Sequence, residues 1–478
     1  MPSMRLAVSR PLVLLAPVLP ATLLLGLPSV SLAQAAPAVS TVFSFSGSQT
    51  NSGPILVDGA LYGTATSGSV PGLIYRTTTN GSSVQTIYQL KIENGYTPTG
   101  GLLLAGDGSD RFLYGTTTLG DLRQVATTGT VFRIKTDGTS FTTLHRFATA
   151  TSLGTSRALN ADGAYPDSEL IEGSDGHLYG VTSSGGPNGT GTVFKIARDG
   201  SSFASLHAFG AIAADETASL NENADGVKPA GGLVEGADGY FYGSTFDGGA
   251  NGRGTIFRLK FDGTGFQTLH VFSAMTANST NSALINADGA APAAGLTDGK
   301  DGFFYGVASV GGESGNGTLF SISPDGSVFT VLHHFDGLNG SQPLGELLLG
   351  NDGRLYGTAS VGGAAGTGGT RSDLGTIFVI GRDGTGFANL HSFDGTKGSS
   401  PVGKMLQLTD SVFVGATTLG GNCGGGTVYQ LSLTGGTVTG RTDCGRGSND
   451  NNNGGGSMSP AFLLLFGLLG FGRRLRTR

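Results

Sequence analysis

Residues 221–226, with the sequence NENADG, alternate oxygen-bearing side chains ahead of a glycine. Ca²⁺ prefers hard oxygen ligands, so Asn221, Asn223 and Asp225 are the candidate metal ligands of this chain and calcium is the candidate cofactor. No acidic residue completes a calcium-loop motif at the far end. Asn-x-Asp-Gly is also ordinary turn chemistry, because short polar side chains bond to nearby backbone. Both interpretations stay open from the sequence.

Histidine is the other residue type that could bind a metal or carry protons. Five of the seven histidines occupy one position of an internal repeat: His145, His207, His270, His333 and His391. Equivalent positions in a repeat lie one per unit, so these rings should be too far apart to share a metal at about 2 Å. The pattern therefore predicts a packing role for them.

Catalytic motifs are missing from the sequence. It contains no GxSxG, HExxH, P-loop or CxxC, and each conspicuous aspartate lies in a repeated turn. It also has no tryptophan, the residue that commonly stacks on sugar rings, which counts against a glycosidase or a lectin. No catalytic residue is assigned, and a role other than catalysis is favoured.

The polar residues above belong to a unit that is repeated seven times. Its clearest mark is an aromatic-glycine step, Leu/Phe-Tyr-Gly or a variant, followed by Gly-Gly, Gly-Thr-apolar-Phe/Tyr, an Asp-Gly turn and Leu-His-x-Phe. The steps recur about every 50 to 65 residues, at 61–63, 113–115, 178–180, 241–243, 304–306, 355–357 and 413–415. In the fourth copy the pattern predicts strands over 232–235, 240–245, 255–260 and 266–272, with Asp-Gly hairpin turns.

Four-stranded units of this length are typical of β-propellers. The sequence therefore predicts an all-β fold, a seven-bladed β-propeller of four-stranded antiparallel blades over residues 36–440. A β-solenoid is the alternative, although it would need shorter coils. Residues 41–45 resemble a fourth strand, whereas the last unit keeps only a thin one near 436–439. The N-terminal strand is thus predicted to complete blade seven and close the ring.

This pattern, LYG…GG…GT-apolar-F over about residues 41–431, resembles the GloVer (Gloeo/Verruco) tandem repeat of choice-of-anchor proteins. The resemblance implies an exported bacterial protein with one of several kinds of anchoring tail. It implies no catalytic residue.

The N-terminal residues 1–35 read as a signal peptide. Arg5 and Arg10 precede a long apolar stretch, and a small-x-small site predicts cleavage by signal peptidase after Ala35. An uncleaved membrane anchor is the alternative, which three prolines in the stretch disfavour.

The C-terminal end consists of a polar Gly/Asn-rich linker, 441–456, and an apolar helix with an arginine cluster, 457–478. It resembles the GlyGly-CTERM sorting signal, which implies transient anchoring in the inner membrane. A rhombosortase-like protease would then cut near Gly454, Gly455 and Gly456, leaving the protein at the cell surface or free outside the cell. The alternative is an ordinary single-pass anchor, although the stretch is short of the roughly 20 apolar residues of a spanning helix.

Residues 36–456 have 22 basic and 34 acidic residues, a net charge of −12. Such a charge argues against nucleic acid as a partner. The two cysteines, Cys423 and Cys444, are predicted to form a disulfide, as is usual in an exported protein.

Insertions at 148–165, 210–228 and 273–291 precede units three, four and five. In a propeller these connections emerge on one face, together with the loops between second and third strands. The favoured function is a binding module that recognises an unknown protein or polysaccharide ligand through this face. The alternatives are an extracellular polymer hydrolase or lyase, which acids of perturbed pKa on the axis would favour, and a structural envelope protein.

Overall fold

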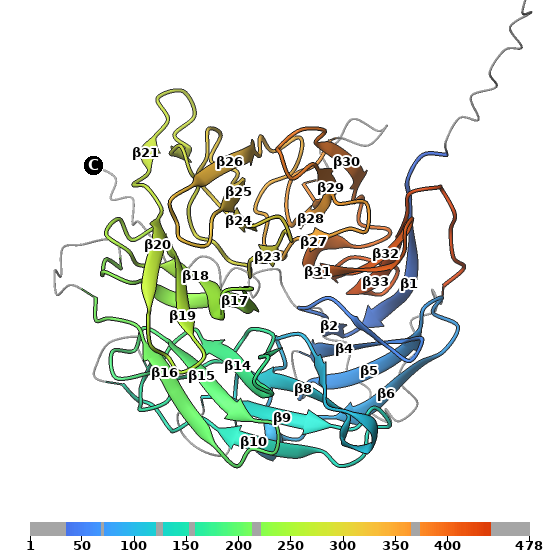
Figure 1. The fold of residues 1–478 in the computed structure, drawn as a ribbon. Helices are drawn as coiled ribbons and strands as arrows, with labels where there is room; N and C mark the ends of the chain where they lie inside the picture. Colours follow the sequence, from blue (N-terminus) through green and yellow to red (C-terminus); the bar gives the residue numbers. More distant parts are fainter. Residues whose placement is uncertain are drawn as a thin grey trace, which may run out of the picture. The chain divides into compact units, whose positions relative to one another are not determined.

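The computed structural model describes residues 35–67, 71–120, 128–152, 158–212, 221–364 and 373–440. These residues form strands and two short 3-10 helices, η1 (Ile92–Asn94) and η2 (Gly108–Asp110). The predicted fold class is confirmed, since seven four-stranded antiparallel blades form a β-propeller (Figure 1).

Each blade runs from an inner strand at the centre of the ring to an outer strand at the rim. Blade 1 consists of β3 (Ile55–Val57), β4 (Ala60–Ser67), β5 (Leu73–Thr78) and β6 (Val84–Gln89), and blade 2 of β7 (Leu103–Ala105), β8 (Phe112–Thr117), β9 (Thr130–Ile134) and β10 (Thr142–Arg146). Blade 3 consists of β13 (Ile171–Glu172), β14 (His177–Thr182), β15 (Thr192–Ala197) and β16 (Phe203–Ala208). Blade 4 consists of β17 (Val227–Glu235), β18 (Tyr240–Asp247), β19 (Thr255–Lys260) and β20 (Gln267–Val271). Blade 5 consists of β23 (Thr297–Asp298), β24 (Phe304–Ala308), β25 (Thr318–Ile322) and β26 (Phe329–His334). Blade 6 consists of β27 (Leu348–Leu349), β28 (Leu355–Ala359), β29 (Thr376–Ile380) and β30 (Ala388–Ser392). Blade 7 consists of β31 (Ser399–Thr409), β32 (Val412–Leu419), β33 (Gly424–Ser432) and β1 (Ala38–Ser46). A short strand, β2 (Ser48–Gln49), also pairs with β4.

The ring closes as the sequence predicts. Strand β1 pairs antiparallel with β33, with Thr41 opposite Tyr429 and Ser44 opposite Thr427. Residues 436–439 form no strand, so the thin fourth strand expected there is wrong and β1 alone takes that place. Joining the first and last strands in one blade makes opening of the ring costly, because it would break a whole strand pairing.

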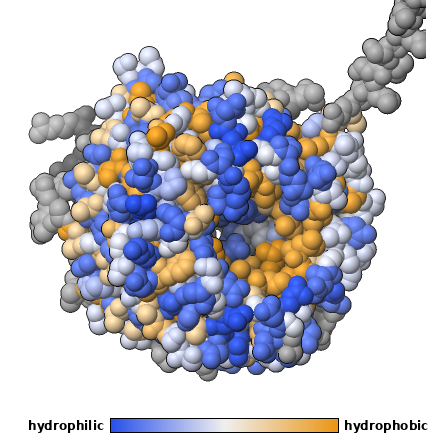
Figure 2. All heavy atoms as spheres, in the orientation of Figure 1, coloured by the Kyte–Doolittle hydropathy of each residue, from blue (hydrophilic) through white to orange (hydrophobic). Residues whose placement is uncertain are grey.

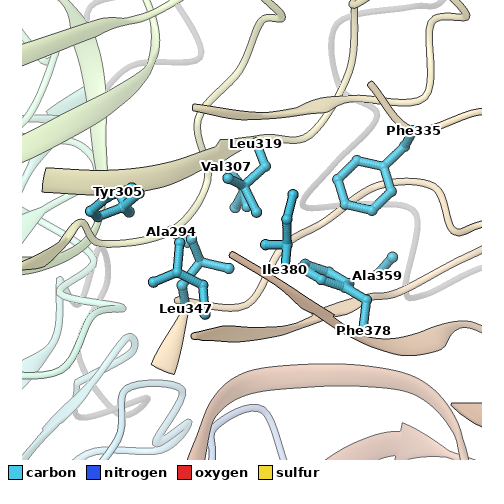
Figure 3. Packing of buried hydrophobic residues seen from close by; sticks show 10 residues of the cluster. Ala294, Tyr305, Val307, Leu319, Phe335, Leu347, Ala359, Phe378 and Ile380 are labelled. Atoms are coloured by element: carbon cyan, nitrogen blue, oxygen red, sulfur yellow. The ribbon is translucent and has the colours of Figure 1, made fainter. Parts of the chain in front are cut away.

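The hydrophobic core lies between blades rather than within one. Each of seven buried clusters joins two consecutive blades, and Figure 3 shows the cluster between blades 5 and 6. There Tyr305 and Leu319 of blade 5 pack with Leu347 and Phe378 of blade 6. The strands are therefore apolar on both faces, because each blade is sandwiched between two others.

The aromatic-glycine steps build this packing, as the sequence indicates. In blade 4, Tyr242 is fully buried and its hydroxyl donates to Asp238 Oδ2 at 2.6 Å. A Cβ on the following Gly243 would lie 2.6 Å from Cζ of Phe257. Glycine is required there because the phenylalanine ring of the third strand occupies the side-chain space.

No helix in the described part of the chain is long and apolar enough to cross a bilayer. The predicted signal peptide up to residue 34, the linker and the C-terminal tail from residue 441 lie outside the described residues. Ala35 is described and is exposed just before β1.

Candidate functional site

Two of the three inserts contain a short pair of strands between blades. Insert 273–291 folds back as a hairpin of β21 (Thr276–Ala277) and β22 (Leu284–Ile285), which projects from the rim in Figure 1. Insert 148–165 pairs β11 (Thr151–Ser152) with β12 (Ala158–Leu159). Residues 213–220 of insert 210–228 lie outside the described residues. We call the side of the propeller that carries these connections the insert-bearing face.

Each insert is tied to the preceding outer strand by a histidine-aspartate pair. The Nε2–Oδ2 distances are 2.9 Å for His145 and Asp162, 3.0 Å for His207 and Asp225, and 3.1 Å for His270 and Asp288. Burial acts to raise the pKa of Asp288, but hydrogen bonds from His270 and Ser273 outweigh it, so this pKa lies below its usual value. The histidines therefore have the structural role that the repeat predicts.

The candidate calcium ligands take part in the same arrangement. Asn223 Nδ2 donates to the carbonyls of Gly210 and Gly226 at 2.9 and 2.7 Å, and Asn223 Oδ1 accepts from Gly226 N at 2.8 Å. Asn221 Nδ2 donates to Asp247 Oδ2 at 3.2 Å. These contacts give the Asn-x-Asp-Gly motif the turn-forming role considered above. Calcium binding stays a prediction; over the described ranges, no three His, Cys, Asp or Glu side chains are grouped to hold a metal.

The short connections after blades 5 and 6 replace the aspartate. Asn339 Nδ2 lies 3.1 Å from His333 Nε2, whereas Lys397 occupies the corresponding place beside His391. His391 Nε2 is buried without a hydrogen-bond partner among the described residues. Burial, together with the charge of Lys397, lowers the pKa of His391 to about 4.

The inner strands place one residue per blade at an equivalent position around the axis. The middle residue of each aromatic-glycine step, on the second strand, pairs with a residue of the inner strand. The equivalent position lies two residues before that inner-strand residue. We call this set the axial layer: Gly53, Gly101, Glu169, Gly232, Gly295, Glu346 and Lys404. Figure 2 shows a hollow at the centre of the ring, where these strands meet.

Close approach of the inner strands explains the glycines. A Cβ on Gly53 would lie 2.0 Å from the carbonyl oxygen of Lys404, and one on Gly295 would lie 2.9 Å from that of Gly232. Backbone contact at this distance leaves no space for a side chain. Packing of the inner strands therefore does not require the charged residues at the other three positions of the axial layer.

The three charged side chains interact across the axis. Lys404 Nζ and Glu346 Oε1 form an ion pair, and their side chains remain 41% and 23% exposed although blades surround them on every side. Glu169 Oε2 lies over Gly101, where a Cβ would be 2.7 Å away. Exposed surface in the middle of a closed ring is typical of a channel wall, so these groups can be reached by solvent.

Glu169 is the least compensated charge of the layer. Burial and, to a lesser extent, the nearby Glu346 carboxylate raise its pKa to about 7, although the charge of Lys404 acts in the opposite direction. Glu169 has no ion-pair or hydrogen-bond partner within the described part of the chain. Two residues earlier, burial raises the pKa of Asp167 to about 6, against a hydrogen bond from Ser183. Perturbed carboxyl groups in a concave site mark a candidate functional site.

Sequence reasoning missed this cluster, although a signal was present. In six of the seven blades the inner strand contains or directly follows a segment such as Pro-x-Gly-x-Leu, at 98–102, 166–170, 229–233, 292–296, 343–347 and 401–405. Aligning these segments isolates the three charged residues as departures from glycine. That the three meet on one axis could not be known before the ring was closed.

A second hollow, of about 520 Å³, lies on the opposite face between the tight turns of blades 2, 3 and 4. Its polar groups largely bind each other, since Arg198 Nη1 lies 3.3 Å from Glu172 Oε1 and Ser174 N donates to Glu235 Oε2 at 2.9 Å. It is therefore a weaker candidate than the axis.

Cys423 is part of a disulfide, while Cys444 lies outside the described residues together with Gly454, Gly455 and Gly456. The backbone N–H of Cys423 donates to Ser44 Oγ of β1 at 3.2 Å. The pairing of the two cysteines stays a prediction, and a bridge at Cys423 would lie beside the strand pairing that closes the ring.

The repeat that builds these sites matches a known family. The model of the Gloeobacter/Verrucomicrobia repeat matches residues 30–222, 214–368 and 275–469. The chain belongs to the Gloeobacter/Verrucomicrobia repeat family. The GloVer resemblance is thereby confirmed, while the choice-of-anchor assignment and the GlyGly-CTERM tail stay predictions.

Solved structures similar to this member of the Gloeobacter/Verrucomicrobia repeat family include an oligogalacturonate lyase in complex with manganese, at 11% identity and TM-score 0.48, covering 83% of this chain and 93% of that one. A Niastella koreensis GH74 enzyme is 12% identical at TM-score 0.49, over 82% of this chain and 53% of that one. A chain of a nidogen/laminin complex is 14% identical at TM-score 0.39, over 72% and 96%. No curated protein matches the sequence. We draw no functional conclusion from these likenesses.

Proposed function

We propose that this protein is an exported β-propeller that binds a protein or polysaccharide ligand through its insert-bearing face. The observation that carries the proposal is the departure from repeat symmetry. Seven copies in one chain show what a blade needs, and all seven keep the aromatic-glycine step or a variant of it. They differ from one another in the inserts and in the axial layer. Residues that the fold does not require, placed on a loop-bearing face, indicate recognition.

Export supports the choice of ligand class. In the proposal, signal peptidase cleaves after Ala35, and a rhombosortase-like protease cuts near Gly454, Gly455 and Gly456. The body then reaches the cell surface or the medium, where envelope proteins and polysaccharides are the available partners. Mass spectrometry of the C-terminal peptide from washed cells and medium tests this step. An intact Arg478 in the membrane fraction would contradict processing.

A short connection from elsewhere in the chain can replace one insert, and the resulting variant tests the binding face. Residues 273–289 can be replaced by the five-residue connection 336–340, since Gly289 and Gly340 hold equivalent places before the next inner strand. Asn339 would then take the place of Asp288 beside His270, so the graft preserves the tie to the outer strand. The control exchanges 394–398 for 336–340, which leaves all three inserts intact.

Purified protein would be applied to an array of bacterial glycans and to immobilised envelope proteins. We expect at least one component to bind the natural body and the control, and to lose tenfold or more affinity for the graft at unchanged melting temperature. Equal binding by the graft would contradict a role of this insert in recognition.

Cleavage of an extracellular polymer, as a hydrolase or a lyase, is the second candidate function, and the axial carboxyl groups favour it. Glu169 has a raised pKa suited to a general acid, whereas Glu346 is ion-paired with Lys404. Two carboxyl groups in different environments are the usual arrangement for acid and base roles. Release of reducing or unsaturated sugar ends by the natural protein, abolished in Glu169→Gln, would support it. Polymers left intact would contradict it.

A further inference from the structure

The geometry points to a ligand class for the axis: the axial layer holds one primary ammonium group of the ligand, between Glu169 and Glu346. This inference rests on the proposed binding function and adds to it the chemistry of the bound group.

Charge gives the first argument. With Glu169 ionised, the layer carries two negative charges and one positive charge, and Lys404 already compensates Glu346. A single monovalent cation would bring the layer to neutrality. An anion would instead meet the unpaired Glu169, and the one lysine is already engaged. An unpaired charge that is partly removed from water is costly, so a cation that compensates Glu169 gains affinity there.

The donor set favours an ammonium group over a metal ion. Calcium takes six to eight oxygen ligands, whereas this layer offers two carboxylates and a lysine. The other four positions are glycines, and no group of three potential metal-ligating side chains exists in the described ranges. An ammonium group needs only a few acceptors, and it can share them with Lys404.

The entrance to the axis supports a ligand with an apolar stem. Inner strands run from the insert connections toward the tight turns, so the residues two places before the axial layer lie nearer the insert-bearing face. In blades 4 to 7 these residues are apolar, namely Ala230, Ala293, Leu344 and Val402. Leu344 remains 37% exposed. Blades 1 to 3 supply Asn51, Thr99 and Asp167 at the same level. A chain or sugar ring bearing an amine would meet apolar surface on one side and polar groups on the other.

The proton is the natural competitor of this cation. The charged groups facing Glu169 are Glu346 and Lys404, with Asp167 in the preceding layer, while neighbouring blades 2 and 4 present Gly101 and Gly232. Protonated Glu169 offers no charge to the ammonium group. Affinity should therefore rise by up to about tenfold per pH unit as Glu169 ionises, and level off above about pH 7.

Calorimetric titration of the full chain with two amine probes tests the inference. n-Butylammonium represents an amine tail and a glucosamine trimer represents an amino sugar; butanol and the N-acetylglucosamine trimer are their uncharged counterparts. We expect one or both amines to bind and the uncharged counterparts to bind at least tenfold more weakly. Glu169→Gln should abolish the pH dependence of n-butylammonium binding, since that amine stays protonated over the range tested.

Glu313→Gln is the matched control, because it removes the same charge from a side chain that is 76% exposed on a blade 5 loop. It should bind as the natural protein does. Equal binding of the acetylated trimer, or unchanged binding by a folded Glu169→Gln variant, would overturn the ammonium inference. The insert graft tests the proposed function separately. If the insert graft loses affinity for the natural ligand but neither amine binds the natural protein, the proposed binding function is retained and only the ammonium inference is rejected.

Discussion

Glu169 should destabilise the propeller at neutral and alkaline pH. Folded Glu169 keeps its proton up to about pH 7, whereas the carboxyl of an unfolded chain releases it near 4.5. The folded state therefore binds more protons between these values, and the free energy of unfolding falls as the pH rises through them. Glu169→Gln removes this contribution and keeps the shape of the side chain.

The raised pKa corresponds to about 3 kcal/mol, at about 1.4 kcal/mol per pKa unit. Solvent in the channel screens part of it, so we expect Glu169→Gln to gain about 2 kcal/mol at pH 8 and nothing at pH 4.5. Titratable groups that do not interact with Glu169 contribute to both proteins alike and cancel, whereas the interactions of Glu169 with Glu346 and Lys404 are part of the measured difference. Glu169→Gly, the residue of four other copies, is a second variant that removes the carboxyl.

Equilibrium denaturation in urea at several pH values between 4.5 and 8.5 measures the difference. The gain should appear as a rising curve centred between pH 5 and 7. A difference that stays flat over this range, or a glutamine variant that is less stable at pH 8, would refute an uncompensated carboxyl on the axis.

Three further predictions concern the blades. Lys397→Asp should restore a histidine-aspartate pair with His391. In the natural protein the lowered pKa of His391 reduces the free energy of unfolding as the pH falls from 6.5 toward 4, so the variant should gain about 2 kcal/mol at pH 5. An NMR titration of His391 in the variant that is still centred near pH 4 would contradict this. Gly243→Ala places a Cβ 2.6 Å from Phe257 and should cost about 1 to 3 kcal/mol in urea denaturation, more than Gly436→Ala, whose Cβ would lie 3.5 Å from its nearest atom. Deletion of 36–46 exposes the edge of β33, so we expect self-association by light scattering and a lower melting temperature; an unchanged monomer would show that closure by β1 is dispensable.

The repeat made most of the fold readable from the sequence. Seven aromatic-glycine steps at regular spacing predict seven blades, because each blade must present the same buried face to its neighbours. The spare strand at 41–45 and the thin end of the last unit together predict closure. Strand limits were not fixed by the repeat: β17 starts at Val227, five residues before the predicted 232, because its pairing with β18 continues past a bulge between Ala230 and Val234.

By itself the sequence determined local and periodic features: turns, strand faces, the blade count and the register that makes five histidines equivalent. Only the tertiary structure decided which residues meet at long range. Glu169 and Lys404 are far apart in the chain and interact because the ring brings all inner strands to one axis. The Asn-x-Asp-Gly motif likewise acquires its partner, the histidine of the preceding outer strand, only on folding. Periodicity follows from what each blade buries, whereas the axial site depends on how seven blades are arranged in space.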